Sequence, residues 1–273
     1  YHSILQKSSN ISIFYKEFKG LCSDPLQKNK GFVILKEKVG KEMLKFEDAA
    51  VERAALAGEA YIAIPVEVYQ SAPGSLQVTA YAACEKIARH FLSLYGADPF
   101  CSDALAWLGS RIAAFMAPRG YKYNAEASEV ILEYAAPKNG VLQLQNTEAI
   151  QIQDQYTWLS YENETGADPD FLDDKVEPAF AVVENRRIVS CACINDAFYA
   201  NGAVEVYVET APAYRGRGYG KRCAASLISH LQRRGLDVLY KCYATNSASA
   251  AIACACGLER TGRRASFVCY ADV

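Results

Sequence analysis

The sequence predicts an α+β protein of two domains, and three observations support this fold class. The chain has 273 residues, of which 51% are hydrophobic, so each of two domains could bury a core of its own. Short apolar runs rich in β-branched residues alternate with segments in which apolar residues recur at helical spacing. In the second half, apolar runs follow one another closely, which predicts a mixed, mostly antiparallel sheet flanked by helices. Loop-like sequence separates the halves, and we place the domains at 1–125 and 126–273.

The first half is expected to form an α/β domain of unknown role. Its predicted elements are strands at 31–35 and 60–69 and helices at 78–95 and 103–116. We find no catalytic motif in this half. His90 is better explained by packing beside Phe91 than by catalysis. A degenerate tandem copy of the second domain is an alternative interpretation of the whole half.

The second half is predicted in more detail. Polar helical stretches near 147–161 and 168–175 come first. The elements that follow are a hairpin of strands 179–183 and 188–194, a strand at 204–210, a helix at 218–234, a strand at 238–243, a helix at 247–256 and a strand at 266–270. Strict alternation in 204–210 places Val206 and Val208 on one face of the sheet and Glu205, Tyr207 and Glu209 on the other.

Charge argues against two classes of partner. The chain carries 29 Lys and Arg against 31 Asp and Glu, a formal net charge of -2. A nucleic-acid binder gains most of its affinity from a basic surface, and a polybasic membrane tether needs clustered Lys and Arg, so we expect neither.

No signal peptide begins the sequence, and no apolar run reaches about 18 residues. We therefore expect a cytoplasmic protein. We expect it to be a monomer or a homodimer.

The chain has 10 cysteines, which invites two interpretations, a disulfide framework or a metal site. No Cys-x-x-Cys pair occurs, and the 3 histidines stand far from one another and from the cysteine pairs, so zinc-site spacing is absent. A reducing compartment disfavours disulfides. We expect no metal and interpret most thiols as small core residues.

The most informative segment runs from Tyr214 to Arg222 and joins the strand that ends at Thr210 to the helix that begins near Gly218. It reads Tyr-Arg-Gly-Arg-Gly-Tyr-Gly-Lys-Arg. Glycines remove Cβ atoms that would hold a ligand away, and backbone N–H groups at a helix N-terminus attract anions. The basic side chains add a local positive field. The segment predicts a phosphate site, and a glycine-rich turn with solvated arginines is the alternative.

Two other phosphate motifs fail on spacing. A Walker loop needs Gly where Arg215 stands and Ser or Thr where Arg222 stands. A dinucleotide motif that starts at Gly216 needs Gly where Lys221 stands. Too little chain follows the loop to build a Rossmann sheet after its first turn.

The loop resembles motif A of the GCN5-related N-acetyltransferase (GNAT) superfamily, R/Q-x-x-G-x-G/A, through Arg215, Gly218 and Gly220. Further residues stand at the separations usual in that family: Pro212, Asn246, Ser249 and Gly257-Leu258. The resemblance covers 126–273 and does not extend to 1–125. It implies a GNAT-like fold for the second half.

The resemblance also implies acetyl-CoA, or another acyl-CoA, as co-substrate. Its pyrophosphate would lie on the backbone of residues 216–221. Its pantetheine arm would pair like an added strand with 208–210, where strands 204–210 and 238–243 splay apart. Asn246 is expected to contact the cofactor, with capping of the next helix as the alternative. The predicted cofactor-binding residues are Val208, Glu209, Thr210, Arg215, Gly216, Arg217, Gly218, Tyr219, Gly220, Lys221, Asn246 and Ser249.

Direct attack by an amine on a thioester needs a base for the amine and an acid for the departing thiolate. Glu209 and Glu205 are the base candidates, and an ordinary polar sheet face is the alternative for both. The acid usual in the family is a Tyr seven residues after the Asn, a position that Ala253 occupies here. Candidate substitutes are Tyr243, Cys256 with its neighbour Cys254, and catalysis by proximity alone.

The sequence thus predicts an N-acyltransferase that moves an acetyl group from acetyl-CoA to an amine. A small-molecule acceptor is favoured over a protein amine because the chain lacks an obvious charged docking tract. A protein N-acetyltransferase is one alternative. A catalytically silent CoA-binding or regulatory module is another, which Ala253 favours. The first half is expected to complete or cover the acceptor site.

Overall fold

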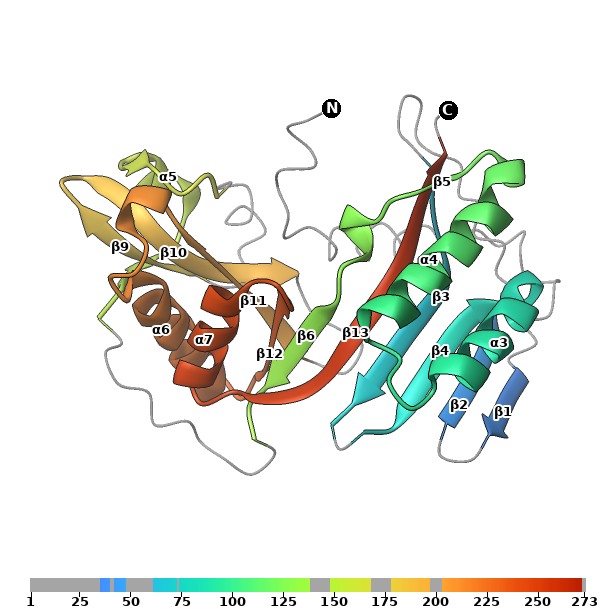
Figure 1. Ribbon diagram of the computed structural model, residues 1–273. Coiled ribbons are helices and arrows are strands. Elements are labelled where there is room, and N and C mark those ends of the chain that lie inside the picture. Colours follow the sequence, from blue (N-terminus) through green and yellow to red (C-terminus); the bar gives the residue numbers. More distant parts are fainter. Residues whose placement is uncertain are drawn as a thin grey trace, which may run out of the picture. The chain divides into compact units, whose positions relative to one another are not determined.

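The computed structural model describes residues 35–39, 42–47, 61–72, 74–137, 148–167, 178–196 and 203–271 (Figure 1). The chain divides into two compact units and passes between them more than once. The described part of the first unit lies within 133–242 and 246–260, and that of the second within 25–132, 243–245 and 261–273. The division therefore differs from the predicted boundary at residue 125, because the C-terminal residues belong to the unit that the first half builds.

The first unit is a sheet flanked by helices (Figure 1). Its strands, in spatial order, are β6 (Ile131–Ala135), β12 (Asp237–Tyr243), β11 (Ala203–Thr210), β10 (Arg187–Asp196), β9 (Ala179–Glu184) and β7 (Ile150–Ile152), with β8 (Glu162–Asn163) beside β10. Neighbours from β7 to β11 pair antiparallel, whereas β12 runs parallel to β11. Helix α6 (Tyr219–Arg233) makes the crossover between these two parallel strands. The mixed, mostly antiparallel sheet predicted from the sequence is confirmed.

Local sequence explains the elements around α6. The β9–β10 hairpin turns at Asn185 and Arg186, whose φ angles of 49° and 63° form the left-handed turn that suits the twist of a hairpin. One face of α6 is buried against β9, β10 and β11. Its fully buried members are small or apolar: Cys223, Ala224, Leu227, Ile228 and Leu231. The helix ends before Gly235, whose φ of 73° allows the chain to turn away.

The opposite face of the same sheet is covered by α5 (Gln155–Leu159). Trp158 of this short helix is 1% exposed and packs with Cys191 and Cys193 of β10. Asp154 caps the helix, since its Oδ1 accepts a hydrogen bond from the backbone N–H of Thr157 at 2.7 Å. The sheet thus carries α6 on one face and the Trp158 cluster on the other.

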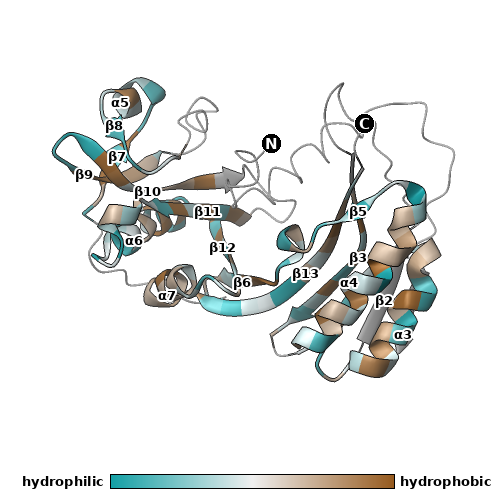
Figure 2. Cartoon of the chain, turned by 45° about the horizontal axis from the view of Figure 1, so that its top comes forward, coloured by the Kyte–Doolittle hydropathy of each residue, from teal (hydrophilic) through white to brown (hydrophobic). Residues whose placement is uncertain are grey.

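The second unit is built from strands in the order β1 (Leu35–Val39), β2 (Glu42–Glu47), β4 (Leu76–Tyr81), β3 (Tyr61–Ser71) and β13 (Glu259–Ala271), with β5 (Lys122–Tyr123) beside β13. Its helices are α3 (Glu85–Tyr95) and α4 (Ser102–Met116), and Phe91 and Ile112 join Val66 and Phe267 in one core. Figure 2 shows both apolar and polar residues along α3, as an amphipathic helix requires. No described strand separates α3 from α4, so this unit does not repeat the order strand, helix, strand, helix that surrounds α6.

Some predicted elements have different bounds. The helix predicted at 78–95 begins only at Glu85, because Leu76, Val78 and Ala80 are buried in alternation and form strand β4. The stretch 147–161 contains strand β7 as well as α5. Residues 31–34 and 168–175 lie outside the described part of the chain. None of the helices that the structure describes is both long and apolar enough to cross a bilayer.

Two Leu→Ala substitutions test the packing of α6. Leu227 is fully buried, whereas Leu159 of α5 is 62% exposed. We expect Leu227→Ala to lower the free energy of unfolding by about 2–5 kcal/mol, because it leaves a cavity under the helix. Leu159→Ala should change it by less than about 0.5 kcal/mol. Urea unfolding followed by circular dichroism measures both, and similar losses for the two variants would contradict this packing.

Candidate active site

Strands β11 and β12 pair along only part of their length. Their parallel register runs from Ala203–Asp237 to Val206–Tyr240 and ends there, although both strands continue. On its other edge, β11 stays paired with β10 as far as Thr210. The segment 208–210 therefore has one edge in the sheet and one edge without a register partner, as expected where two strands diverge. Such an edge can pair with an extended ligand.

The glycine-rich loop leads from this open edge into α6. Gly218 is the N-cap of the helix, with φ of 79° and no side-chain cap. The first helical hydrogen bond runs from the Arg222 N–H to the Gly218 carbonyl at 3.1 Å. The backbone N–H groups of the preceding turn therefore have no acceptor within the helix. With the helix dipole, they form a site suited to a phosphate group.

The three glycines of the loop have different physical roles. Gly216 and Gly218 have φ of 78° and 79°, and an added Cβ would meet nothing within 4 Å, so the backbone conformation is what requires glycine. A Cβ at Gly220 would lie 3.0 Å from Thr210 Oγ1 and 3.0 Å from Ile252 Cδ1. Gly220 thus lets α6 approach β11 and helix α7 (Ser247–Ala255) closely. These positions fit the pyrophosphate loop that the motif predicts.

The three arginines of the loop each contact a neighbouring group. Arg215 Nε donates to the Thr210 carbonyl at 3.0 Å. Arg217 lies over the ring of Tyr214, with its guanidinium carbon 5.1 Å from the ring centroid. Arg222 donates to the Glu148 carbonyl at 3.3 Å. Tyr219, another predicted cofactor contact, donates its hydroxyl to Glu184 of β9 and so turns toward the sheet.

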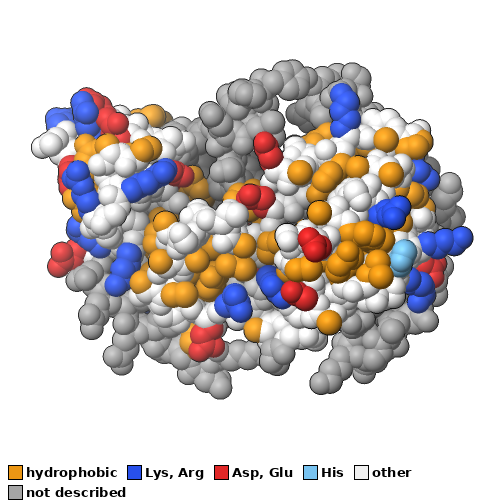
Figure 3. Space-filling model, viewed as in Figure 1, with side chains coloured by type: hydrophobic (Ala, Val, Ile, Leu, Met, Phe, Trp, Pro, Cys, Tyr) orange, Lys and Arg blue, Asp and Glu red, His pale blue; other side chains and the backbone are white. Residues whose placement is uncertain are grey.

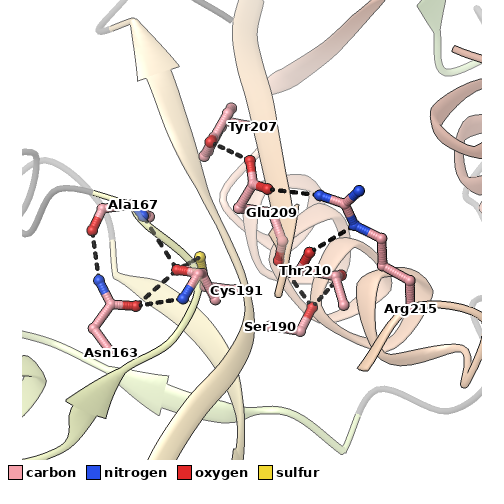
Figure 4. A network of polar contacts seen from close by, with 9 residues as sticks. Asn163, Ala167, Ser190, Cys191, Tyr207, Glu209, Thr210 and Arg215 are labelled. Carbon is pink, nitrogen blue, oxygen red and sulfur yellow. Dashed lines mark hydrogen bonds and ion pairs between the residues drawn. The ribbon is translucent and has the colours of Figure 1, made fainter. Parts of the chain in front are cut away.

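The polar face of β11 carries a connected network beside the open edge (Figure 4). Glu209 Oε2 accepts a hydrogen bond from the Tyr207 hydroxyl at 2.7 Å, and its Oε1 lies 3.6 Å from Arg215 Nη2. Beneath the strand, Ser190 Oγ donates to the Glu209 carbonyl at 3.0 Å and lies 2.8 Å from Thr210 Oγ1. The side chain of Glu209 is 29% exposed, so it can meet a substrate.

The other base candidate has a different environment. Glu205 is 6% exposed, and its Oε2 lies 2.8 Å from the Lys241 ammonium of β12. It lies in the paired part of β11, four residues from Glu209, which corresponds to roughly 13 Å along a strand. Removing either member of a buried ion pair leaves the other buried without its partner, which destabilises the fold. This geometry favours a structural role for Glu205 and leaves Glu209 as the better base candidate.

The acid candidates are also distinguished by their surroundings. Ala253 is fully buried on α7 and has no proton to donate. Cys256 is fully buried as well, and burial raises the pKa of its thiol to about 11. Burial also raises the pKa of the Tyr243 hydroxyl. Tyr243 belongs to the second unit. For Tyr243 and Cys256 the catalytic role remains a prediction.

Asn246 and Ser249 are engaged at the start of α7. Asn246 Oδ1 accepts a hydrogen bond from the Ser249 N–H at 3.0 Å, so Asn246 caps the helix. The Ser249 hydroxyl lies 2.8 Å from the Tyr240 hydroxyl. The cap is the alternative weighed for Asn246 from the sequence, and its contact with a cofactor remains a prediction.

Sequence reasoning did not single out Tyr207, Ser190 or Lys241 as site residues. The alternation along β11 had already placed Tyr207 on the face of Glu209, and that was the available signal. Ser190 and Lys241 come from neighbouring strands, and their contacts depend on register, which no local pattern reveals. Within the described ranges, no group of three or more His, Cys, Asp or Glu residues could hold a metal ion.

Thiol labelling tests the accessibility of the cysteines on and after α7. Cys254 is exposed, whereas Cys256 is fully buried. Near neutral pH, a maleimide should modify Cys254 in the folded protein and leave Cys256 unmodified, because a buried thiol with a pKa of about 11 carries almost no thiolate. Peptide mass spectrometry reads out both sites. Equal rates at the two cysteines would contradict the burial of Cys256.

Comparisons with known proteins found one family model and several similar solved structures. Residues 177–264 match the model of the GNAT acetyltransferase family. A GNAT-family acetyltransferase structure from Colwellia psychrerythraea is 14% identical, covers 56% of this chain and 57% of its own, and has a TM-score of 0.41. A GCN5-related N-acetyltransferase-like protein from Streptococcus suis is 19% identical, with 62% and 68% covered and a TM-score of 0.40. A GCN5-related N-acetyltransferase from Sphaerobacter thermophilus is 10% identical, with 72% of each chain covered and a TM-score of 0.41. No curated protein matches the chain.

The matched segment coincides with the structural features described above. It begins just before β9 and ends within β13, so it contains the hairpin, the open edge of β11, the glycine-rich loop, α6, β12 and α7. Identities and TM-scores as low as those of the solved structures add nothing to this assignment, which rests on the family model and the loop. The chain therefore carries a GNAT acetyltransferase domain at residues 177–264.

Proposed function

We propose that the protein is an N-acyltransferase that uses acetyl-CoA or another acyl-CoA. The observation that carries the proposal is the uncapped N-terminus of α6 behind Gly216 and Gly218, next to the open edge of β11. Backbone N–H groups of the first helical turn would bind the pyrophosphate, and 208–210 would pair with the pantetheine arm. A backbone N–H of β11 would then polarise the thioester carbonyl.

Glu209 is the residue that we propose as general base. It removes a proton from the acceptor ammonium and passes it to water, which frees the nitrogen lone pair for attack on the thioester carbon. The new C–N bond forms, the C–S bond breaks, and the second nitrogen proton ends on the thiolate. We assign no side chain to this last step, because Ala253 offers no donor and a thiolate can depart without one.

The acceptor that we propose is a small-molecule amine. It would approach the side chain of Glu209, which is 29% exposed on the face of β11 opposite α6. An anionic carboxylate at this position favours a cationic amine. On the surface seen in Figure 3, Lys and Arg side chains lie among uncharged and hydrophobic ones, which gives no support to nucleic acid as the acceptor. A protein amine is the alternative acceptor.

Two measurements test this function. Calorimetry should show binding of acetyl-CoA, and a thiol-release assay with a panel of small amines should show turnover with at least one of them. Absence of acetyl-CoA binding would reject the proposal. Turnover of peptides but of no small amine would favour a protein acceptor.

A catalytically silent CoA-binding module is the second candidate function. Ala253 favours it, because the position is buried and carries no acid. This candidate predicts tight acetyl-CoA binding with no thiol release for any amine. The same two measurements therefore separate it from the enzyme.

A further inference from the structure

On the polar face of β11, the Trp158 cluster packs against the side chain of Tyr207 and anchors it. Tyr207 is half-buried and packs against the cluster of Ile152, Trp158 and Cys193. Cys193 is its register partner on β10, so the two residues lie opposite each other in the ladder. Packing against this cluster limits the rotamers that are open to the Tyr207 ring.

The Tyr207 hydroxyl is directed at the carboxylate of Glu209 (Figure 4). Its oxygen lies 2.7 Å from Glu209 Oε2, the distance of a charge-assisted O–H···O hydrogen bond. The two residues stand two apart on the same strand face, so the contact exists only while β11 is extended. This bond therefore ties the direction of a flexible carboxylate to a rigid ring.

Two other described groups near Glu209 do not orient it in this way. Arg215 Nη2 is 3.6 Å from Oε1, longer than a hydrogen bond, and its side chain is 62% exposed. Cys191, the register partner of Glu209, is a fully buried thiol whose pKa burial raises to about 12, so it brings no charge near neutral pH. Arg215 thus places a positive charge near Glu209, and Tyr207 orients the carboxylate of Glu209 through a hydrogen bond.

We propose that Tyr207 is the positioning residue for Glu209, and that its hydroxyl holds the carboxylate toward the open edge of β11, where the amine must lose its proton. The catalytic part of this inference rests on the proposed function, in which Glu209 is the general base. Tyr207 does not itself touch the reacting atoms. The contact between the two side chains can be tested separately, whether or not the protein is an enzyme.

The first test measures the contact itself. In Tyr207→Phe, the carboxyl group of Glu209 loses the hydrogen bond that the Tyr207 hydroxyl donates to its Oε2, so the chemical shift of its carboxyl carbon should change. Side-chain carbon NMR of the full chain measures this chemical shift. Tyr161→Phe is the matched control, because Tyr161 packs against the same cluster without a described hydrogen bond to Glu209. An unchanged carboxyl resonance of Glu209 in Tyr207→Phe would overturn the proposal.

The second test measures the catalytic consequence. We expect Tyr207→Phe to lower kcat about tenfold and to leave the Kd for acetyl-CoA within twofold. In a Glu209→Gln background the same change should cost nothing further, because there is no base left to position. Equal losses in both backgrounds would mean a merely structural role for Tyr207. A wild-type protein that fails to bind acetyl-CoA would reject the proposed function while leaving the NMR result to decide the contact.

Discussion

A Gly218→Glu variant is expected to fold and to bind acetyl-CoA about 100-fold more weakly than the wild-type protein, a loss of ~2.7 kcal/mol. The reason is the geometry of the N-cap. Gly218 has φ of 79°, no side-chain cap and open space around its Cα, so the new carboxylate would lie at the first turn of α6. There it would accept hydrogen bonds from the same N–H groups that bind the pyrophosphate, and its negative charge would repel that of the pyrophosphate.

The matched control for this variant is Gly235→Glu. Gly235 has φ of 73° and equally open space, but it follows the other end of α6. Both substitutions force a non-glycine residue into the left-handed region, at a cost of roughly 1–2 kcal/mol in stability. Only Gly218→Glu should lose affinity in calorimetry. Equal weakening by the two variants would show that backbone strain, and not the anion site, is responsible.

Glu209→Gln is expected to lower kcat by about 10²–10⁴-fold, the range for removal of a general base. The amide keeps the shape of the side chain and can still accept the hydrogen bond from Tyr207, so the fold and the Kd for acetyl-CoA should change little. The rate that remains should rise with pH as the free amine becomes more abundant in solution. Steady-state thiol release across a pH series measures both effects.

Glu162→Gln provides the control for the loss of a carboxylate. Glu162 of β8 is an exposed residue paired with Arg187 at 2.8 Å, a type of contact worth no more than about 1 kcal/mol. This variant should retain the wild-type kcat. If Glu209→Gln also retained it, the amine would lose its proton to another group or to water, and the assignment of the base would be wrong.

Much of the first unit could be predicted because its signals are local. Alternation along 204–210 and the spacing of apolar residues in 218–234 predict β11 and α6 within a residue or two of their observed bounds. The loop between them was recognisable because glycine is required where φ is positive and where a helix approaches a strand closely. These constraints restrict which residue type can occupy a single position, so they can be recognised in the sequence.

Strand β4 shows where local reasoning was wrong. Val78, Tyr81 and Cys84 stand at helical spacing, yet Leu76–Tyr81 is a strand paired with β3 and β2. Pairing with those strands buries Leu76, Val78 and Ala80 in alternation. A short apolar run fits either period, and the partner strands decide between them.

For the candidate site, the sequence by itself predicted the glycine-rich loop before α6 and the face on which Glu205, Tyr207 and Glu209 lie, and the family resemblance predicted the open strand edge. Only the tertiary structure separated the two carboxylates, because Lys241 of β12 reaches Glu205 and the Tyr207 hydroxyl reaches Glu209. The first contact depends on the register between strands, and the second on the packing beneath Tyr207. Both are set by residues distant in the chain, whose positions no local pattern encodes.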